Sequence, residues 1–523
     1  MRFIEIHVDA VLDPRYISSL RDVMQRRGVQ GGVRIWQPQP SWSERVRASC
    51  VRRLCELEWR MCRALGRQSP VELIYAARPH EAASESSPEE ALPSALVLFN
   101  SEAELPLHVL RSTGAGAVVV RFPKAARSDL IGLDEVCAEA QLVSVLIDVW
   151  RPGDQAPHVT DLKIKTSFTL SMTQEMVMRK TISAVADCLW RLQEGIALPA
   201  DFAAQALAWP PLCSEQKAPK DAVATPSGLW PLVRYLWLMA ERTAGKAVEK
   251  FRGDRTQWFV QLSRSSWRQH EPSRLQPLSN PQDHYRADPF VVSHQGRTVI
   301  YVEEFSNETQ LGHIAALQVS DSGAVTDLGV CLREPFHLSF PYVFRWHGQL
   351  YMCPESNHAR QIRVYRCESF PMKWVLDTVI MENIAACDSM LFEKDGRWWL
   401  LANLDSSGLD IDFCSELYLF WADSPLSTQW TAHPLNPVVR DGRKARNGGI
   451  VFEDGRIYRV AQGHSYRIYG QSHAVYEITV LNETDYQEVP AHRNMPPVGS
   501  LGAHHLSSTG EWTVSDSLMR RQA

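Results

Sequence analysis

Residues 287–304 read ADPFVVSHQGRTVIYVEE: an apolar run, a turn containing Gly296, and a second run rich in β-branched and aromatic residues. This pattern predicts a β-hairpin. Four further copies follow: SFPYVFRWHGQLYMCPES (339–356), CDSMLFEKDGRWWLLAN (387–403), NGGIVFEDGRIYRVAQG (447–463) and, more faintly, GAHHLSSTGEWTVSDS (502–517). Their turn glycines are spaced by 52, 48, 59 and 55 residues, close to the period of about 50 of some propeller repeats. Five copies predict a five-bladed, all-β propeller in which each hairpin supplies two of a blade's four strands.

The repeats also predict where polar side chains meet. Eight residues before each turn glycine stand Asp288, Phe340, Asp388, Asn447 and Gly502. Seven residues after it stand Glu303, Glu355, Asn403, Gln462 and Ser517. Equivalent positions of a radial repeat form rings around its axis, and these rings are polar or acidic where a filled core would carry Val or Leu. We therefore expect the functional site in a polar cavity on the axis.

The sequence before the repeats supplies a closing strand and a linker. Gln257–Leu262 (QWFVQL) predicts a strand that pairs with the last blade and leaves the ring without open edges. Trp230–Phe251 has helical periodicity, and residues 209–228 have the Pro-rich, polar composition of a linker. We therefore expect a linker and amphipathic helix over residues 209–254 and the propeller over residues 255–523.

Residues 1–208 alternate between strand and helix signals. Strands are predicted at Arg2–Val8, Val71–Ala76, Ala95–Phe99 and Ala117–Phe122, and helices at Ser43–Leu65 and Met172–Leu192. Residues 79–95, rich in Pro, Ser and Glu, predict a surface loop. Alternating strands and helices indicate an α/β domain with a mostly parallel sheet.

Composition narrows the class of protein. The chain has 523 residues, too many for one core, and its net charge of −5 removes the electrostatic reason to expect a nucleic-acid partner. The 11 cysteines include no pair at CxxC spacing, so we expect no metal site. The N-terminal stretch lacks signal-peptide features, and no apolar run reaches about 18 residues. We therefore expect a cytoplasmic protein without a transmembrane segment, with peripheral membrane contact left open by the arginine-rich helix Ser43–Leu65.

A family resemblance adds to this reading. Residues 255–518 contain the motifs HYRADPF, YVEEF, FHLSFPYVF, LYMCPES, VYRCESFPMKW, RNGGIVF and YRVAQG. As a set they resemble the propeller at the N-terminus of plant glucosamine inositolphosphorylceramide transferases, and that of bacterial proteins in which this propeller follows a formyltransferase-like domain. The propeller is similar in turn to the five-bladed fold of furanosidases and fructan-cleaving enzymes. The resemblance implies a protein that acts on or binds a glycan, glycolipid or sugar nucleotide in cell-surface glycoconjugate synthesis.

The resemblance also implies catalytic residues. In the furanosidase and fructan-cleaving families one Asp attacks or activates water, a second Asp orients or stabilises, and a later Glu is the general acid. Asp288 matches the first Asp and Asp388 the second. The fourth-blade position carries Asn447, which cannot protonate a leaving group, whereas glycoside hydrolysis needs a protonated carboxyl beside the scissile bond. Glu355 is the candidate proton donor, with Glu303 or Glu304 as alternatives.

Seven further polar residues are candidate substrate-binding residues: Glu303, Glu304, Asn403, Arg446, Asn447, Arg459 and Gln462. Arg suits phosphate or carboxylate recognition because its guanidinium is a bidentate donor. Arg446 could equally be a structural counter-ion of the acidic ring. Glu303 and Glu304 are adjacent on a strand, so one of them faces outward.

A second resemblance concerns the N-terminal domain. VSVLIDVWRPGDQAP (143–157) and TLSMTQEMVMRKTISAVADCLWRLQEG (169–195) look like the latter half of a folate-dependent formyltransferase domain. That family places an Asn, a His and an Asp around the transferred formyl group. Here Arg121-Phe122-Pro123 stands where the Asn-x-His is expected, and Asp148 is a partial match to the Asp. We therefore expect a formyltransferase-shaped domain without formyl transfer, and a protein without a cofactor.

Three functions remain open at this point. The first is an enzyme that transfers or modifies a sugar at the axial cavity. The second is a non-catalytic carbohydrate-binding or scaffold protein. It is favoured by Asn447, which cannot act as an acid, and by Arg121-Phe122-Pro123 in place of the Asn-x-His motif. The third is a sugar N-formyl- or N-acyltransferase, which requires proton transfer by another histidine, such as His108 or His158.

Overall fold

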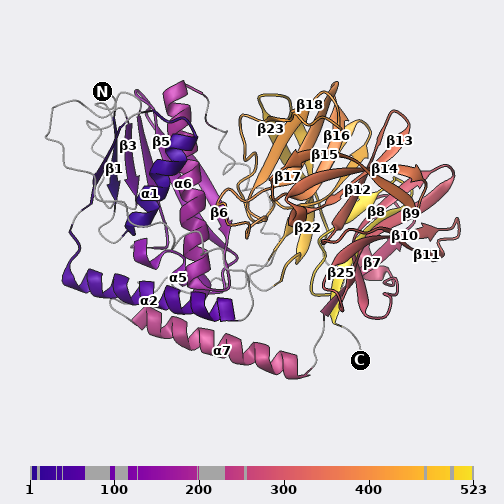
Figure 1. The fold of residues 1–523 in the computed structure, drawn as a ribbon, viewed down its shortest axis with the longest axis horizontal. Helices are drawn as coiled ribbons and strands as arrows, with labels where there is room; N and C mark the ends of the chain where they lie inside the picture. The colour runs from indigo at the N-terminus through magenta and orange to yellow at the C-terminus, as the bar shows by residue number, and fades with distance from the viewer. Residues whose placement is uncertain are drawn as a thin grey trace. The chain divides into compact units, whose positions relative to one another are not determined.

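The computed structural model describes residues 3–8, 12–30, 32–37, 39–64, 95–99, 116–125, 128–196, 198, 230–252, 256–464, 468–494 and 500–520 (Figure 1). These residues form two compact units. The first holds the elements up to residue 196 and most of the helix that begins at Trp230, and the second holds the strands from Thr256 onward. None of the described helices is long and apolar enough to span a bilayer.

The first unit is an α/β domain with one six-stranded sheet. Its strands are β1 (Phe3–Val8), β2 (Gly32–Trp36), β3 (Ala95–Phe99), β4 (Gly116–Arg121), β5 (Leu142–Trp150) and β6 (His158–Lys165), in the order β2-β1-β3-β4-β5-β6. The first three pairs are parallel, and the β4–β5 and β5–β6 pairs are antiparallel. The predicted α/β class is confirmed. The predicted strand Val71–Ala76, the linker 209–228 and residues 79–94 of the predicted loop lie outside the described residues.

Helix α6 (Leu170–Glu194) covers part of this sheet. It begins after Thr169, whose hydroxyl accepts a hydrogen bond from the Met172 amide at 3.3 Å, and it ends at Gly195, which has a φ of +66°. Both are typical helix-end residues. The helix packs against α1 (Pro14–Arg26) and strands β4, β5 and β6. The other described helices are α2 (Trp42–Ala64), η1 (Ser128–Leu130), α5 (Leu133–Cys137) and α7 (Trp230–Arg252).

The second unit is a five-bladed propeller, as predicted (Figure 1). Blade one is β8 (His284–His294), β9 (Arg297–Ser306), β10 (Gly312–Val319) and β11 (Val325–Leu332). Blade two is β12 (Ser339–Trp346), β13 (Gln349–Glu355), β14 (Gln361–Ser369) and β15 (Lys373–Glu382). Blade three is β16 (Cys387–Lys394), β17 (Arg397–Asn403), β18 (Leu417–Ala422) and β19 (Thr431–Ala432). Blade four is β20 (Asn447–Glu453), β21 (Arg456–Gly463), β22 (Ser472–Leu481) and β23 (Tyr486–Asn494).

The fifth blade joins the two ends of the propeller sequence. It consists of β24 (Leu506–Ser508), β25 (Thr513–Arg520) and β7 (Thr256–Ser263), and β7 pairs antiparallel with β25. The innermost strands contact one another in the cycle β8–β12–β16–β20–β24–β8. The ring is therefore closed, and the closing strand predicted from QWFVQL is confirmed. Two short helices, η4 (Pro272–Arg274) and η5 (Asn357–Ala359), lie in its loops.

One buried ion pair fastens the fourth blade. Arg459 on β21 donates from Nε and Nη2 to the two carboxylate oxygens of Glu488 on β23, each at 2.8 Å, and both side chains are 0% exposed. Tyr486 also donates to Glu488, at 2.8 Å. The Arg459 guanidinium holds the pKa of Glu488 at about 2, although burial opposes that shift.

We predict that Arg459→Ala lowers the free energy of unfolding by about 3–5 kcal/mol, because it leaves the Glu488 carboxylate buried without its counter-charge. Arg456→Ala is the matched control on the same strand: its pair with Glu477 is 3.4 Å long and the arginine side chain is 62% exposed, so we expect the free energy of unfolding to change little. Denaturant unfolding followed by circular dichroism measures both. Equal losses in the two variants would contradict the prediction.

Candidate functional site

The innermost strands of the first three blades are interrupted at one repeat position. On β8 the pairing with β9 shifts at Asp288, so that two residues lie opposite one. The same shift occurs at Phe340 on β12 and at Asp388 on β16. The three residues have φ values of +49°, +47° and +48°, a left-handed conformation that Asp tolerates better than most residues. These β-bulges bring Asp288 and Asp388 close enough at the axis for the charge of Asp388 to raise the pKa of Asp288.

The fourth blade carries glycine at the corresponding place. On β20 the bulge consists of Gly448 and Gly449, and Asn447 holds the position before it, as Ala287 does on β8. Counting eight residues back from the turn glycine Gly455 predicts Asn447 at the bulge. In this blade the bulge begins at Gly448, seven residues before that glycine. A Cβ on Gly448 would lie 2.4 Å from the carbonyl oxygen of His504. The close approach of the fifth blade thus excludes any carboxyl-bearing residue from this position.

A buried arginine compensates the charge of Asp388. Arg446 Nε donates to Asp388 Oδ2 at 2.5 Å, and its Nη2 lies 3.4 Å from Glu355 Oε2. Gln462 Nε2 donates to the same Asp388 oxygen at 3.2 Å. Burial raises the pKa of Asp388 to about 7, an effect that Arg446 reduces and Glu355 reinforces. Arg446 is therefore a counter-ion of the acidic ring. This is one of the two roles that the sequence left open for it.

Asp288 belongs to an Asp–His–Asp array. His504 Nε2 lies 3.3 Å from Asp288 Oδ1, and His504 Nδ1 lies 2.8 Å from Asp516 Oδ2. Asp516 Oδ1 accepts hydrogen bonds from the amides of His504 and His505, each at 3.0 Å, and its Oδ2 accepts one from the Asp288 amide at 3.2 Å. The Trp258 ring packs on His504 at 4.0 Å between centroids. The backbone therefore fixes Asp516, and the His504 imidazole lies between the carboxylates of Asp516 and Asp288.

The array has strongly perturbed proton affinities. Burial raises the pKa of Asp288 to about 7, with His504 opposing and Asp388 adding to the rise. Burial alone would lower the pKa of His504, but Asp516 and then Asp288 outweigh it and raise that pKa to about 8. For Asp516, burial is outweighed by His504, and its pKa is lowered. At neutral pH the array thus contains two groups, Asp288 and His504, that are both near their titration points.

Tyr469 connects the two halves of the cluster. Its ring centroid lies 5.8 Å from the Arg446 guanidinium carbon and 5.6 Å from the His504 ring, edge to face. Tyr469 is 41% exposed, whereas the side chains of Asp288, Arg446 and Glu355 keep 9–13% of their surface exposed. The cluster is therefore mostly dry but reaches solvent beside an aromatic face.

Six of the residues predicted for the site lie in this axial cluster: Asp288, Glu303, Glu355, Asp388, Arg446 and Gln462. Glu303 faces the cluster from β9, and burial, reinforced by Asp288 and Glu355, raises its pKa well above the ordinary value. Its neighbour Glu304 instead lies 2.7 Å from Arg286 and 3.1 Å from His313. Glu304 is thus the member of the pair that faces away from the axis.

Three other predicted residues bond to the protein's own backbone or to a buried partner. Asn403 donates from Nδ2 to the carbonyls of Glu416 and Ala445, each at 2.8 Å. Asn447 donates from Nδ2 to the Asp388 carbonyl at 2.9 Å. Arg459 is held by Glu488, as described above. The Asn447 contact joins blades three and four beside the cluster, whereas the Arg459 pair lies within blade four.

Sequence reasoning missed His504, Asp516 and Tyr469. Both His504 and Asp516 belong to the faintest repeat copy. His504 lies two residues after the ring position Gly502, and Asp516 lies one residue before the ring position Ser517. Counting from the turn glycine therefore did not select them. The dipeptide His504-His505 was the available signal. Tyr469 was not named as a site residue, although the dipeptide Tyr469-Gly470 belongs to the motifs that carry the resemblance.

Two groups of three side chains among the described residues have ligand-type atoms within 4.8 Å of one another: His284, Glu304 and His313; and Asp288, His504 and Asp516. In the second group both nitrogens of His504 face carboxylate oxygens at hydrogen-bonding distances. In the first group Glu304 pairs with Arg286 at 2.7 Å and contacts His313 at 3.1 Å. We therefore identify neither group as a metal site. The axial cluster is suited to proton transfer near neutral pH, to hydrogen bonding with hydroxyl groups and, at Arg446, to binding an anion.

Arg121 and Asp148, the two residues compared with formyltransferase motifs in the sequence analysis, form an ion pair. Arg121, at the end of β4, lies 2.6 Å from Asp148 on β5. The two side chains therefore neutralise each other. His158 begins β6, and His108 lies outside the described residues.

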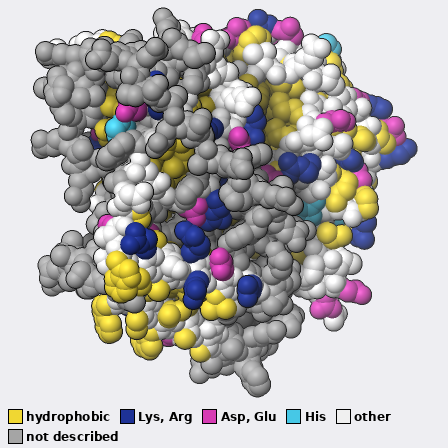
Figure 2. All heavy atoms as spheres, turned by 60° about the vertical axis from the view of Figure 1, so that its left-hand side comes forward, with side chains coloured by type: hydrophobic (Ala, Val, Ile, Leu, Met, Phe, Trp, Pro, Cys, Tyr) yellow, Lys and Arg dark blue, Asp and Glu magenta, His cyan; other side chains and the backbone are white. Residues whose placement is uncertain are grey.

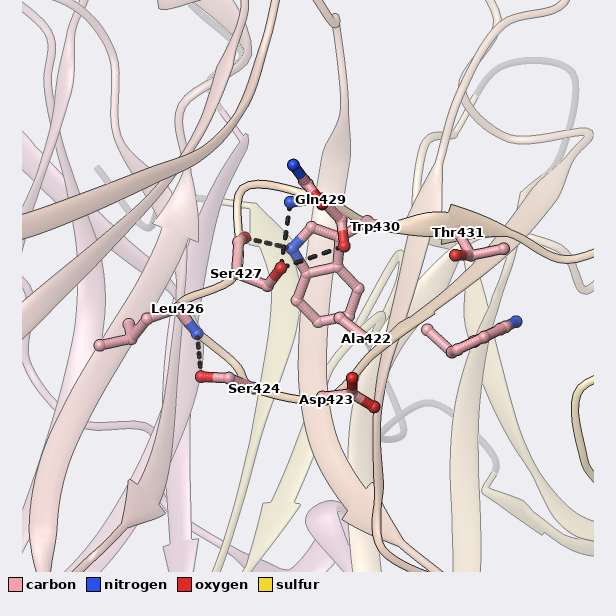
Figure 3. A pocket seen from close by; sticks show the side chains of 9 residues that line it. Ala422, Asp423, Ser424, Leu426, Ser427, Gln429, Trp430 and Thr431 are labelled. Carbon is pink, nitrogen blue, oxygen red and sulfur yellow. Dashed lines mark hydrogen bonds between the residues drawn. The ribbon is translucent and has the colours of Figure 1, made fainter.

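Two cavities lie away from the cluster. One, of ≈ 470 Å³, is lined by residues 421–431 at the outer strands β18 and β19 of blade three, where Trp430 donates from Nε1 to the Ser427 carbonyl at 2.8 Å (Figure 3). The other, of ≈ 500 Å³, is lined by the turn ends of the innermost strands and includes Phe344, Phe392 and Phe452. Neither contains the carboxylates of the axial cluster.

Comparison with known proteins matches the propeller. Residues 275–498 fit the family model described as "Glucosamine inositolphosphorylceramide transferase 1, N-terminal". The resemblance is confirmed. Glucosamine inositolphosphorylceramide transferase 1 of Oryza sativa subsp. japonica is 36% identical over 208 residues, which are 39% of this chain and 27% of the relative. The Arabidopsis thaliana protein of that name is 35% identical over 243 residues, 43% of this chain and 31% of the relative. The match thus spans less than a third of either relative.

Solved structures are similar at a lower level. A family 117 glycoside hydrolase of the marine bacterium Zobellia galactanivorans is 13% identical, with 49% of this chain and 80% of that chain covered and a TM-score of 0.35. The catalytic domain of the Coprinopsis cinerea GH62 alpha-L-arabinofuranosidase is 12% identical, with 47% and 95% covered and a TM-score of 0.35. We draw no conclusion about function from similarity at this level.

We predict that Asp288→Asn raises the melting temperature by roughly 3 °C or more near pH 7.5, and by less near pH 4.5. Because the pKa of Asp288 rises from 3.8 to about 7 on folding, ionisation costs the folded state stability that accumulates as the pH increases from about 4 to about 7. Asn mimics the protonated carboxyl and removes this cost.

Differential scanning fluorimetry across this pH range measures the effect. Asp321→Asn, at an exposed position in the same blade, is the control and should shift the melting temperature equally at every pH. A lower melting temperature for Asp288→Asn near pH 7.5 would mean that the carboxylate is held as a structural ion pair instead.

Proposed function

We propose that the axial site binds a glycan, glycolipid or sugar nucleotide and acts on it in glycoconjugate synthesis, in the cytoplasm, by glycosyl transfer or another modification of the sugar. The similarity of residues 275–498 to a family named for glucosamine inositolphosphorylceramide transfer supports the class of substrate. The observation that carries the proposal is the meeting of Asp288 and Asp388, from separate blades, with Arg446 and Tyr469 in one nearly dry cluster.

The cluster offers the groups that recognise a sugar. One face of the Tyr469 ring stacks on His464 at 4.8 Å between centroids, and the exposed part of the ring can contact the C–H groups of a sugar. Glu355 accepts a hydrogen bond from the Asp388 amide, and Gln462 donates one to the Asp388 carboxylate. Both side chains therefore lie beside the carboxyl group that the substrate would meet. Arg446 supplies positive charge for a phosphate-bearing donor, with Asp388 limiting how strongly it attracts anions.

Acid and base roles follow from proton affinity. Asp288 and Asp388, with pKa values raised to about 7, are suited to accept a proton near neutral pH. We assign proton donation to Glu303 in place of Glu355, because burial raises the pKa of the Glu303 carboxyl well above its ordinary value, whereas Glu355 lies beside the Arg446 guanidinium. Glu303 would thus supply the proton that neither Asn447 nor Gly448 can supply.

His504 acts through Asp288 in this proposal. Both of its nitrogens face carboxylates, so the imidazolium is stabilised, and a proton near Asp288 Oδ1 can reside on either partner. Asp516 keeps the ring in place because three backbone amides and the imidazole fix its carboxylate. His504 is therefore a positioning residue that sets the charge of Asp288.

A second candidate function is carbohydrate binding without turnover. It is favoured by the close contact at Gly448, which leaves the fourth blade without an acid. Asp288→Asn separates the two candidates, because an enzyme loses turnover and keeps its ligand, whereas a binding protein has no turnover to lose.

We predict that a thermal-shift screen of sugar nucleotides, guided by mass spectrometry of co-purifying small molecules, finds a stabilising ligand, and that Asp388→Asn weakens its binding by about tenfold or more. Loss of a hydrogen bond to a charged group has this size. Asp395→Asn, at the exposed turn of the same blade, is the control and should bind normally. Stabilisation that survives Asp388→Asn unchanged would place the ligand away from the axis.

We predict that His504→Gln destabilises the protein more near pH 6 than near pH 9. The pKa of His504 rises from 6.5 to about 8 on folding, so its stabilisation is fully present below about pH 6.5 and is lost as the pH rises through about 8. His505→Gln is the matched control: burial lowers the pKa of this neighbour to about 3, so the cost of the substitution should not vary between about pH 6 and 9.

NMR of histidine-labelled protein gives a direct readout. The imidazole signal missing from the His504→Gln spectrum should titrate near pH 8 in the wild type and at lower pH in Asp288→Asn. A signal that titrates near pH 6.5 in both proteins would remove His504 from the proposed mechanism. The ligand screen is the separate test of the sugar site.

A further inference from the structure

Helix α7 has one apolar face that its own unit already covers. Leu232, Tyr235 and Met239 pack in a cluster with Val51 and Leu54 of α2. The Tyr235 hydroxyl accepts a hydrogen bond from the Leu170 amide at 2.9 Å and donates one to Glu58 of α2. Arg242, about two turns beyond Tyr235 on the same face, donates to the Val136 carbonyl at 2.6 Å. Positions spaced by three and four residues thus form the inner face of α7.

The opposite face of α7 is apolar as well. Trp230, Val233, Trp237, Ala240 and Ala244 follow the same spacing on the outer side, and all are exposed. The two tryptophans are 62% and 66% exposed. A surface helix of a water-soluble domain normally carries polar residues on this side. A second apolar face with two large aromatic side chains in solvent therefore indicates an interaction surface.

Helix α2 continues this surface. Trp42, 73% exposed, and Val46 and Leu57 lie on its outer side. The exposed charged residues on the described side chains of α2 and α7 are Arg45, Arg52, Arg53, Arg60, Arg234 and Glu241. Figure 2 shows hydrophobic side chains gathered at the lower left with Lys and Arg side chains beside them. We call the outer sides of α2 and α7 the tryptophan–arginine face.

We propose that the tryptophan–arginine face binds the surface of an anionic membrane. Three exposed tryptophans supply rings that partition into the interface between headgroups and acyl chains, and five arginines against one glutamate supply charge complementary to anionic lipids. Arginine stems extend along apolar surface while their guanidinium groups reach the headgroups. Both helices would lie in the plane of the membrane, since no described helix is suited to cross it.

The excess of arginines on the tryptophan–arginine face favours a membrane over a second copy of the chain. A second copy of the chain would bring the same excess of arginines to the contact and repel it, unless each copy's face met another surface. A lipid surface rich in phosphate accepts all of the arginines at once, whatever their exact positions. This proposal rests on the α/β unit and does not depend on the function of the propeller.

Co-sedimentation of the full chain with vesicles tests it. We expect the protein to bind vesicles of phosphatidylcholine with about 30% phosphatidylglycerol at least tenfold more tightly than pure phosphatidylcholine, roughly the effect of two bound basic residues. Binding should weaken as salt rises from about 50 to about 300 mM, because salt screens exposed charges. Trp230→Ser combined with Trp237→Ser should lower the affinity for anionic vesicles about tenfold or more.

The control variant is Leu376→Ser, an exposed apolar residue on β15, which should bind as the wild type does. Equal melting temperatures of all variants establish that they fold. Absence of binding to anionic vesicles, or binding that the double tryptophan variant retains in full, overturns the proposal. A dimer in light scattering that the double variant abolishes would also overturn it, by assigning the face to a second copy of the chain.

Discussion

Closure of the ring is the constraint on which the propeller depends. Strand β7, at the start of its sequence, completes the sheet of β24 and β25 at the end. This pairing satisfies backbone groups that would otherwise form two open edges. It also brings the fifth blade against the first and fourth, so that His504 and Asp516 reach Asp288, and the His504 carbonyl approaches Gly448. Without closure the carboxylates of separate blades would not share one cluster.

The cost of that convergence is electrostatic. Several carboxyl groups in a nearly dry space raise one another's pKa and oppose folding when they ionise. The protein compensates each half differently: Arg446 neutralises Asp388, and a protonated His504 stabilises Asp288 and Asp516. Glu303 has no partner as close, since His337 lies 3.5 Å away, and burial raises the pKa of Glu303 well above its ordinary value. The balance leaves groups that exchange protons near neutral pH, which a fully compensated structural cluster would not contain.

Arginine side chains serve two different purposes in this protein. Some are buried against carboxylates, as in the Arg459–Glu488 pair of the propeller. Five on the outer sides of α2 and α7 stand in solvent beside exposed tryptophans. The buried arginines hold elements of the fold in place, and the exposed ones have no comparable packing role, so a surface of opposite charge is the natural complement.

The sequence alone was sufficient for the architecture. Hairpin phrases repeated at near-constant spacing predicted five blades, QWFVQL predicted the closing strand, and alternating signals predicted the α/β domain, because each of these features is encoded by local periodicity. Asp288, Asp388 and Glu355 could be named for the same reason, since they recur at countable positions. Which neighbour each side chain meets could not be counted.

The tertiary structure decided the rest. It placed Glu303 toward the axis and Glu304 away from it, assigned Arg459 to Glu488, and shifted the fourth-blade bulge from Asn447 to Gly448. It also introduced His504 and Asp516, which the weak fifth repeat concealed. These outcomes depend on the register of each hairpin and on distances between blades far apart in the chain. A one-residue change in register moves a side chain to another face of the sheet, and no local pattern in the sequence records it.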